Sequence, residues 1–128
     1  MTERLVVDAD AAIDFIRQDR TTPPPLREAR HVLLPVTVVG ELFAGAELSR
    51  RVAENLATVE ELIARCVVIY PDTETARVYG SLRRSERTAS MGRVNDLWIA
   101  AICIRNDVPL LTGDRGFDVL TELKVIHY

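Results

Sequence analysis

The sequence predicts an α/β fold built on a mainly parallel sheet of about five strands. Two observations predict it. Short runs of branched and aliphatic residues alternate along the chain with helical patterns, and most of these runs end at Asp, Pro or Gly residues that stop strands. The chain has 128 residues, of which 48% are hydrophobic, and it shows neither an internal repeat nor a linker. It is long enough to bury a core, so we expect one domain over residues 1–128.

Five apolar runs are the expected strands. The first run is followed by Asp8, the third by Pro71 and the fourth by Gly113. The runs cover residues 4–7, 32–35, 66–70, 108–112 and 125–128. Because helical patterns separate most of them, we expect neighbouring strands to run parallel.

Helical patterns fill the segments between these runs. One helix follows the first strand over residues 11–16, and a short polar helix opens at residues 23–25. Thr37 and Ser49 are the expected N-caps of the next two helices, whose apolar residues recur every three or four positions. These helices would cover the faces of the sheet.

Two further helices carry the polar residues of interest. An arginine-bearing helix starts at Asp72 or Thr73 and runs toward Gly92. The last helix begins at Asn95 and is apolar nearly all round, so we expect its N-terminus to lie inside the fold. Asp96 then stands at the mouth of a buried helix.

The charge balance limits the partners of the chain. A net charge of −3 argues against a protein that coats nucleic acid by bulk electrostatics, but it permits local binding. Four arginines crowd one stretch, Arg83, Arg84, Arg87 and Arg93, and they are either phosphate contacts or a solvated helix face. No apolar window approaches the roughly 18 residues of a membrane span, so we expect a cytoplasmic protein without a membrane segment.

Several classes of site lose support. Cys66 and Cys103 lack metal-site spacing and are expected to be buried thiols, while His31 and His127 are far apart and are expected to be structural. The sequence contains no phosphate-binding P-loop, no dinucleotide-binding glycine motif and no G-x-S-x-G.

The carboxylates are the remaining candidates. Asp8 follows the first strand and Asp114 the fourth, so both should project from the carboxyl edge of a parallel sheet, where sites gather. Each acid also has a local explanation: Asp8, Asp10 or Asp96 as a helix cap, Glu41 as a solvated helix residue, and Asp114 as part of a turn. Carboxylates brought together repel one another unless cations neutralise them, and Mg²⁺ or Mn²⁺ is the usual remedy.

Four segments in order resemble the PIN-domain ribonucleases, and among them the VapC-type toxins of type II toxin–antitoxin pairs. The segments are VVDADAAIDFI, PVTVVGELFAGA, GRVNDLWIAA and LLTGDRGFDVL. The resemblance implies a PIN-like three-layer α/β/α fold with a five-stranded parallel sheet, commonly dimeric, and a protein antitoxin that binds across the active-site groove. It implies a Mg²⁺- or Mn²⁺-dependent endoribonuclease that cleaves RNA through a metal-activated water held by acidic residues.

Carried over residue by residue, the family's catalytic acids fall on Asp8, Glu41, Asp96 and Asp114. Asp8, Asp96 and Asp114 would hold the metal. Thr112 matches the hydroxyl residue that precedes the last acid, and Phe117 matches an aromatic that packs below it. Asp10 departs from the family, which carries Ser, Thr or Asn near this position, so it either tightens metal binding through the waters of the metal or caps the helix. Asp118 stays outside the core set. Arg83, Arg84, Arg87 and Arg93 would hold the RNA backbone.

Two alternatives stay open. The segments VVDAD and GDRGFD also resemble the haloacid-dehalogenase phosphatases, although the only lysine, Lys124, follows the second segment instead of preceding it. The other alternative is a catalytically silent interaction domain that keeps the fold and binds a partner.

Overall fold

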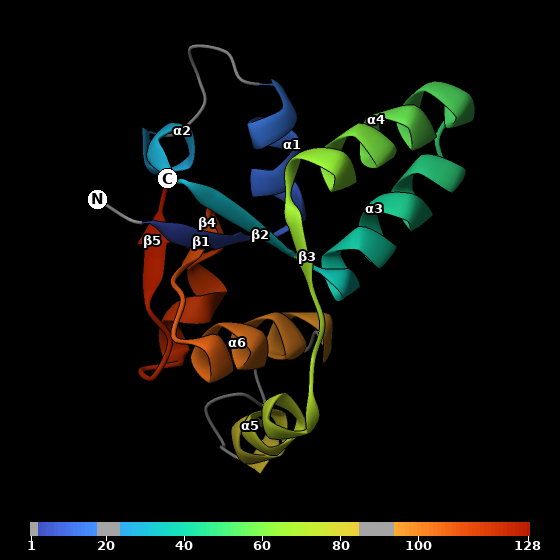
Figure 1. The fold of residues 1–128 in the computed structure, drawn as a ribbon. Coiled ribbons are helices and arrows are strands. Elements are labelled where there is room, and N and C mark those ends of the chain that lie inside the picture. The colour runs from blue at the N-terminus through green and yellow to red at the C-terminus, as the bar shows by residue number, and fades with distance from the viewer. Residues whose placement is uncertain (1–2, 18–23, 85–93) are drawn as a thin grey trace.

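A five-stranded, all-parallel sheet organises the protein, which is described here from a computed structural model over residues 3–17, 24–84 and 94–128. The strand order is β3-β2-β1-β4-β5 (Figure 1). The strands are β1 (Arg4–Val7), β2 (His31–Pro35), β3 (Val67–Ile69), β4 (Leu110–Thr112) and β5 (Val125–His127). The predicted α/β class with about five parallel strands is confirmed.

Helices lie on both sides of the sheet. In Figure 1, α1, α3 and α4 lie on one side of the strands, and the α5–α6 pair lies on the other. The helices are α1 (Ala9–Arg17), α2 (Pro24–Glu28), α3 (Val36–Glu47), α4 (Val52–Arg65), α5 (Thr73–Arg84), α6 (Val94–Asn106) and the 3₁₀ helix η2 (Arg115–Val119). Within the described ranges, none of the helices combines the length and the apolar content that crossing a bilayer requires.

The three inner strands form the centre of the core. Every residue of β4 is buried, and in β1 and β2 only the first residue is exposed. The edge strands β3 and β5 are only partly buried. Strands covered by helices on both faces must be apolar at successive positions, which is why these segments read as continuous aliphatic runs instead of alternating ones.

The strand order creates a switch point between β1 and β4. These strands are hydrogen-bonded neighbours, but the chain leaves β1 toward β2 and leaves β4 toward β5, on opposite sides. Open parallel sheets bind ligands where two such connections diverge, beyond the carboxyl ends of the strands. Asp8 and Asp114 follow these two strands, so the topology places both acids at the switch point.

The two predicted hydroxyl caps are wrong. Thr37 lies within α3, which Pro35 precedes without any side-chain cap, and the Thr37 hydroxyl is buried without a hydrogen-bond partner among the described residues. The Ser49 hydroxyl donates to the Ala46 carbonyl at 2.6 Å, so it closes α3 instead of opening α4. A strand that runs directly into a helix leaves no separate capping residue.

The starts of α5 and α6 differ from each other. α5 starts at Thr73, one of the two predicted starts, and Asp72 caps it, because the Asp72 carboxylate accepts the Thr75 N–H at 2.8 Å. The predicted continuation of α5 beyond Arg84 lies outside the described residues. The expected burial of the start of α6 is wrong, because Val94 is 50% exposed and burial begins only at Leu97. The helix body is buried and its first turn opens to solvent.

The cysteines are free thiols with different environments. Cys103 is buried in α6 as predicted, whereas Cys66 is only half-buried after α4. Burial raises the pKa of the Cys66 thiol to about 11, against a smaller opposing effect of the Arg65 charge. Both thiols therefore stay protonated and unreactive at neutral pH.

Core packing at Leu34 should dominate stability. Leu34 in β2 is fully buried, so Leu34→Ala leaves a cavity and should lower the free energy of unfolding by about 2–5 kcal/mol in urea denaturation. The matched control is Leu48→Ala, because Leu48 is 88% exposed and its loss should change stability by less than about 0.5 kcal/mol. Equal effects of the two substitutions would contradict the described core.

Candidate active site

Asp8 connects the first helix to the switch point. One oxygen of its carboxylate, Oδ1, accepts the Ala11 N–H at 3.0 Å and so caps α1. The other, Oδ2, accepts the Thr112 hydroxyl at 2.5 Å, across from β4. Asp8 therefore serves both as a helix cap, through one oxygen, and as a candidate site residue that the other oxygen fixes at the edge of the sheet.

Thr112 joins Asp8 to Asp114. Its side chain is fully buried at the end of β4. The hydroxyl donates a hydrogen bond to Asp8, and its oxygen accepts the Asp114 N–H at 3.0 Å. Asp114 in turn accepts the Gly116 N–H at 2.8 Å and caps η2. A Cβ at Gly116 would lie 3.0 Å from the Asp114 carboxylate, so glycine allows this close turn.

The protonation of Asp8 reflects its surroundings. Burial raises the pKa of the Asp8 carboxyl above its ordinary value of 3.8, and the nearby negative charges of Asp10 and Asp114 raise it further. Hydrogen bonds from Thr112 and Ala11 act in the opposite direction but do not cancel the rise. The charged form of Asp8 is therefore unfavourable in the folded protein, and a cation bound at this edge would stabilise it.

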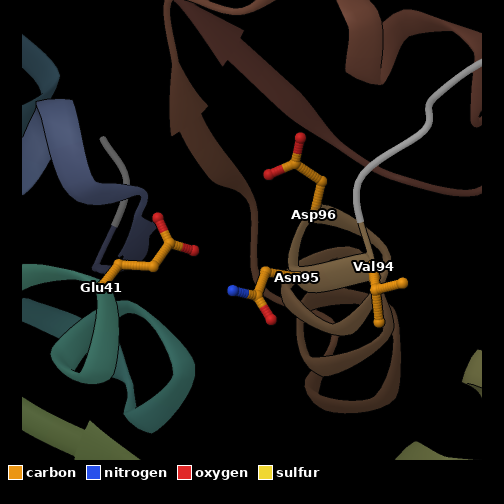
Figure 2. A pocket seen from close by; sticks show the side chains of 4 residues that line it. All are labelled: Glu41, Val94, Asn95 and Asp96. Carbon is orange, nitrogen blue, oxygen red and sulfur yellow. The ribbon is translucent and has the colours of Figure 1, made fainter. Parts of the chain in front are cut away.

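Glu41 and Asp96 face a common cavity. A cavity of about 400 Å³ is lined by Glu41 from α3 and by Val94, Asn95 and Asp96 from the first turn of α6. Figure 2 shows both carboxylates directed into the space between the two helices, whereas the Val94 side chain points away from Glu41. The exposed first turn of α6 thus presents Asp96 to solvent-accessible space.

The structure brings the four predicted acids together two by two. Thr112 links Asp8 to Asp114, and the cavity joins Glu41 to Asp96. In the described part of the chain, no three His, Cys, Asp or Glu side chains are arranged as a ready-made metal cage. Carboxylate oxygens still suit Mg²⁺ or Mn²⁺, because Mg²⁺ usually keeps several waters and binds through one or two carboxylates and the phosphate of its substrate. The donor set fits such an ion.

Three polar side chains near this edge were not in the predicted site. His127 in β5 contacts the Thr112 carbonyl through Nδ1 at 3.2 Å, and its Nε2 lies 2.7 Å from the Asp118 carboxylate. These contacts agree with the structural role expected for His127 and give Asp118 a partner. Tyr128 follows β5 and donates its hydroxyl to Asp14 of α1. The strand-end rule that selected Asp8 would also have selected Tyr128.

The described arginines of the basic stretch lie in the last turn of α5, a helix that packs against α6. Tyr79 of α5 stacks on Trp98 of α6, with ring centroids 4.1 Å apart and planes at 11°. Arg83 lies one turn beyond Tyr79, donates to its hydroxyl at 3.3 Å and covers its ring at 6.0 Å. Arg84 is exposed, and Arg87 and Arg93 lie outside the described residues.

Comparison with known proteins gives a consistent result. The family model described as PIN domain matches residues 5–123. Over 104 residues the chain is 31% identical to ribonuclease VapC5 of Mycobacterium tuberculosis, which covers 73% of this chain and 76% of that protein.

Solved structures of similar fold include toxin–antitoxin complexes. A chain of DNA-bound VapBC from Salmonella typhimurium matches with a TM-score of 0.80 and 25% identity, over 99% of this chain and 98% of that one. A chain of VapBC-5 from M. tuberculosis matches with a TM-score of 0.75 and 25% identity, over 98% and 99%.

Replacement of Asp8 by Asn tests the electrostatic cost at the switch point. Because the pKa of Asp8 is higher in the folded state than its ordinary 3.8, the folded protein binds this proton more tightly, and wild-type stability falls as pH rises from about 3.8 through the folded pKa. Asn carries no charge, so Asp8→Asn should be more stable than wild type at pH 7 in EDTA. The difference should shrink toward pH 3 in urea denaturation.

Asp107→Asn is the control with the opposite sign. Lys124 lowers the pKa of Asp107, so the Asp107 charge stabilises the folded state above pH 3.8 and its removal should reduce stability at pH 7. Asp107 has φ of 53°, which Asn also tolerates. A destabilised Asp8→Asn protein at pH 7 would contradict the described environment of Asp8.

Proposed function

This chain belongs to the PIN-domain family and within it to the VapC-type ribonucleases, and from that premise we propose that its acidic edge cleaves RNA endonucleolytically with Mg²⁺ or Mn²⁺. The observation that carries the proposal is the placement of Asp96. Its carboxylate shares a cavity with Glu41 and stands on the family's matching motif, GRVNDLWIAA. Because the first turn of α6 opens to solvent, a metal ion and a substrate can reach this carboxylate.

The acids divide two roles in the proposal. Asp8, Asp96 and Asp114 would hold the divalent ion, and Glu41, which shares a cavity with Asp96, would orient the attacking water or accept its proton. A bound Mg²⁺ or Mn²⁺ would supply charge compensation for the phosphodiester during displacement. Thr112 keeps Asp8 and Asp114 in fixed orientations through its buried hydroxyl, and Asp10, which is exposed, acts on Asp8 through its charge.

The arginines would hold the RNA backbone. Arg83 and Arg84 stand in the last turn of α5, and the proposal adds Arg87 and Arg93 from the following segment. Guanidinium groups bind phosphate oxygens in a planar, two-pronged geometry. Because the acids repel a polyanion, a basic stretch would help to bring the substrate to them.

The partner in the proposal is a protein antitoxin. The similar chains from S. typhimurium and M. tuberculosis come from VapBC complexes. A second cavity of about 270 Å³ lies between α1, α3 and α4, and it shares Glu41 with the first. Apolar residues line much of it, including Ile13, Leu42 and Val59, so a partner segment seated there would reach the active site.

We also propose a homodimer acting in the cytoplasm, where its RNA substrates are.

The alternatives are less well supported. A match to the PIN domain over residues 5–123 leaves no place for a haloacid-dehalogenase phosphatase, and that reading gives Glu41 and Asp96 no role. A silent interaction domain would not need both carboxylate pairs at one sheet edge. It remains the outcome if folded protein binds neither a divalent ion nor RNA.

Cleavage assays test the reaction directly. Purified protein should cut a defined RNA mixture in Mg²⁺ or Mn²⁺ and not in EDTA, and Asp96→Asn or Glu41→Gln should reduce the rate about 100-fold or more, as expected for removal of a catalytic group. The matched control is Glu61→Gln, an exposed acid of α4 paired with Arg65, which should cut at the wild-type rate. Cleavage by Asp96→Asn at the wild-type rate would overturn the assignment.

Salt titration tests the arginines. Arg83→Ala combined with Arg84→Ala should weaken RNA binding and reduce the dependence of log K on log salt by about 1 to 2, because each phosphate contact releases about one counterion. The control pair, Arg50→Ala with Arg51→Ala, removes the same charge from the turn between α3 and α4. Equal losses in the two pairs would mean that only net charge matters.

A further inference from the structure

An aromatic ring lies over the acidic edge and has no role in the proposed reaction. Tyr128 follows β5, and a Cβ placed on Gly113 would lie 3.9 Å from the carbon of the Tyr128 ring that carries the hydroxyl. Gly113 separates Thr112 from Asp114. The ring therefore lies against the short loop that holds the last catalytic acid.

The same end of the ring, through its hydroxyl, is tethered to α1. The Tyr128 hydroxyl donates to Asp14 of α1, and Asp8 and Asp10 are close enough for their charges to act on it. Burial raises the pKa of the phenol, and these three acids raise it further. The hydroxyl therefore stays protonated at neutral pH and adds no negative charge to a site that must accept a polyanion.

The tethered side chain is still 46% exposed. An aromatic side chain that is fixed by its backbone and by a hydrogen bond at its hydroxyl has lost much of its rotational freedom, so a ligand that stacks on it costs little further entropy. Single-stranded RNA is bound in this way: unpaired bases stack on Tyr, Phe or Trp rings while cations hold the backbone. In the proposed function, Arg83 and Arg84, which are exposed in the last turn of α5, are the cations that hold the backbone.

We propose that Tyr128 is the stacking platform for an unpaired base next to the bond that is cleaved, and that Asp14 is the positioning residue that holds the ring. The inference rests on the proposed ribonuclease function and names its substrate class as single-stranded RNA. Every base has an aromatic face, so the platform favours unpaired over duplex RNA without reading sequence.

Binding of a fluorescent RNA tests the platform. The catalytically silenced Asp96→Asn protein is titrated in Mg²⁺ with a single-stranded RNA that carries 2-aminopurine, whose emission is quenched on stacking. Adding Tyr128→Leu should abolish the quenching at the stacked position and weaken binding about 5- to 150-fold. Tyr128→Phe and Tyr128→Trp keep a ring and should retain both signals. Tyr70→Leu is the control: Tyr70 is 68% exposed and follows β3, the edge strand opposite β5, so its loss should change neither the quenching nor the affinity.

Asp14 has its own pair of variants. Asp14→Asn keeps a carbonyl oxygen that accepts the Tyr128 hydroxyl and should preserve the 2-aminopurine signal, whereas Asp14→Ala frees the ring and should weaken the signal and the affinity together. In the active enzyme, Tyr128→Leu should raise KM with a smaller change in kcat. A merely structural tyrosine would instead lower the melting temperature without moving the stacking signal.

The outcomes separate this inference from the function on which it rests. If wild-type protein cleaves RNA and Tyr128→Leu keeps the same KM and quenching, the platform is wrong and the ribonuclease stands. If Tyr128→Phe binds as weakly as Tyr128→Leu, the hydroxyl and not the ring matters, and stacking is wrong. If folded wild type neither binds nor cleaves RNA, both fall. Photocrosslinking of 5-iodouridine RNA to the Asp96→Asn protein needs no change at Tyr128, and crosslinks confined to other residues would overturn the platform.

Discussion

One buried hydroxyl holds the two sides of the switch point together. The Thr112 hydroxyl donates a hydrogen bond to Asp8 at the end of β1 and accepts one from the N–H of Asp114 at the end of its own strand. A buried hydroxyl must find its partners within the protein, because leaving them unmade costs more than making them gains. The N-terminus of α1 and the loop after β4 are therefore held at a fixed distance from each other. The carboxylates of Asp8 and Asp114 are kept close despite their repulsion.

The opposite side of the site depends on how helices pack. The Tyr79–Trp98 stack joins α5 to α6, and the buried face of α6 seats that helix against the sheet. The first turn of α6 projects beyond the core, and it carries Asp96 toward Glu41 on α3 (Figure 2). The rigid helix body and the open first turn are parts of one arrangement, since a carboxylate can meet a cation and a substrate only where water reaches it.

The caps show where local reasoning holds and where it fails. Asp72 precedes α5 after a short irregular segment, so its side chain is free to turn back onto the helix, and the local pattern is sufficient. Thr37 has no such segment before it: β2 ends at Pro35 and α3 begins at the next residue. Ser49 sits between two helices and contacts both: its hydroxyl donates to the Ala46 carbonyl of α3 and accepts the Asn55 side-chain amide of α4, without capping the backbone of α4. Sequence spacing alone does not decide between such neighbours.

The sequence by itself determined the α/β class, the strands and the acids that follow them, because strands buried on both faces must be apolar throughout and because the motifs of a family keep their order. It also identified Asp8, Glu41, Asp96 and Asp114 as candidates, although not their grouping. Tertiary structure alone decided that Thr112 joins Asp8 to Asp114 while Glu41 meets Asp96 across a cavity. Tertiary structure also brought the Tyr128 hydroxyl to Asp14, although the two residues are 114 positions apart along the chain. Such contacts depend on strand order and helix packing, which a single sequence does not record.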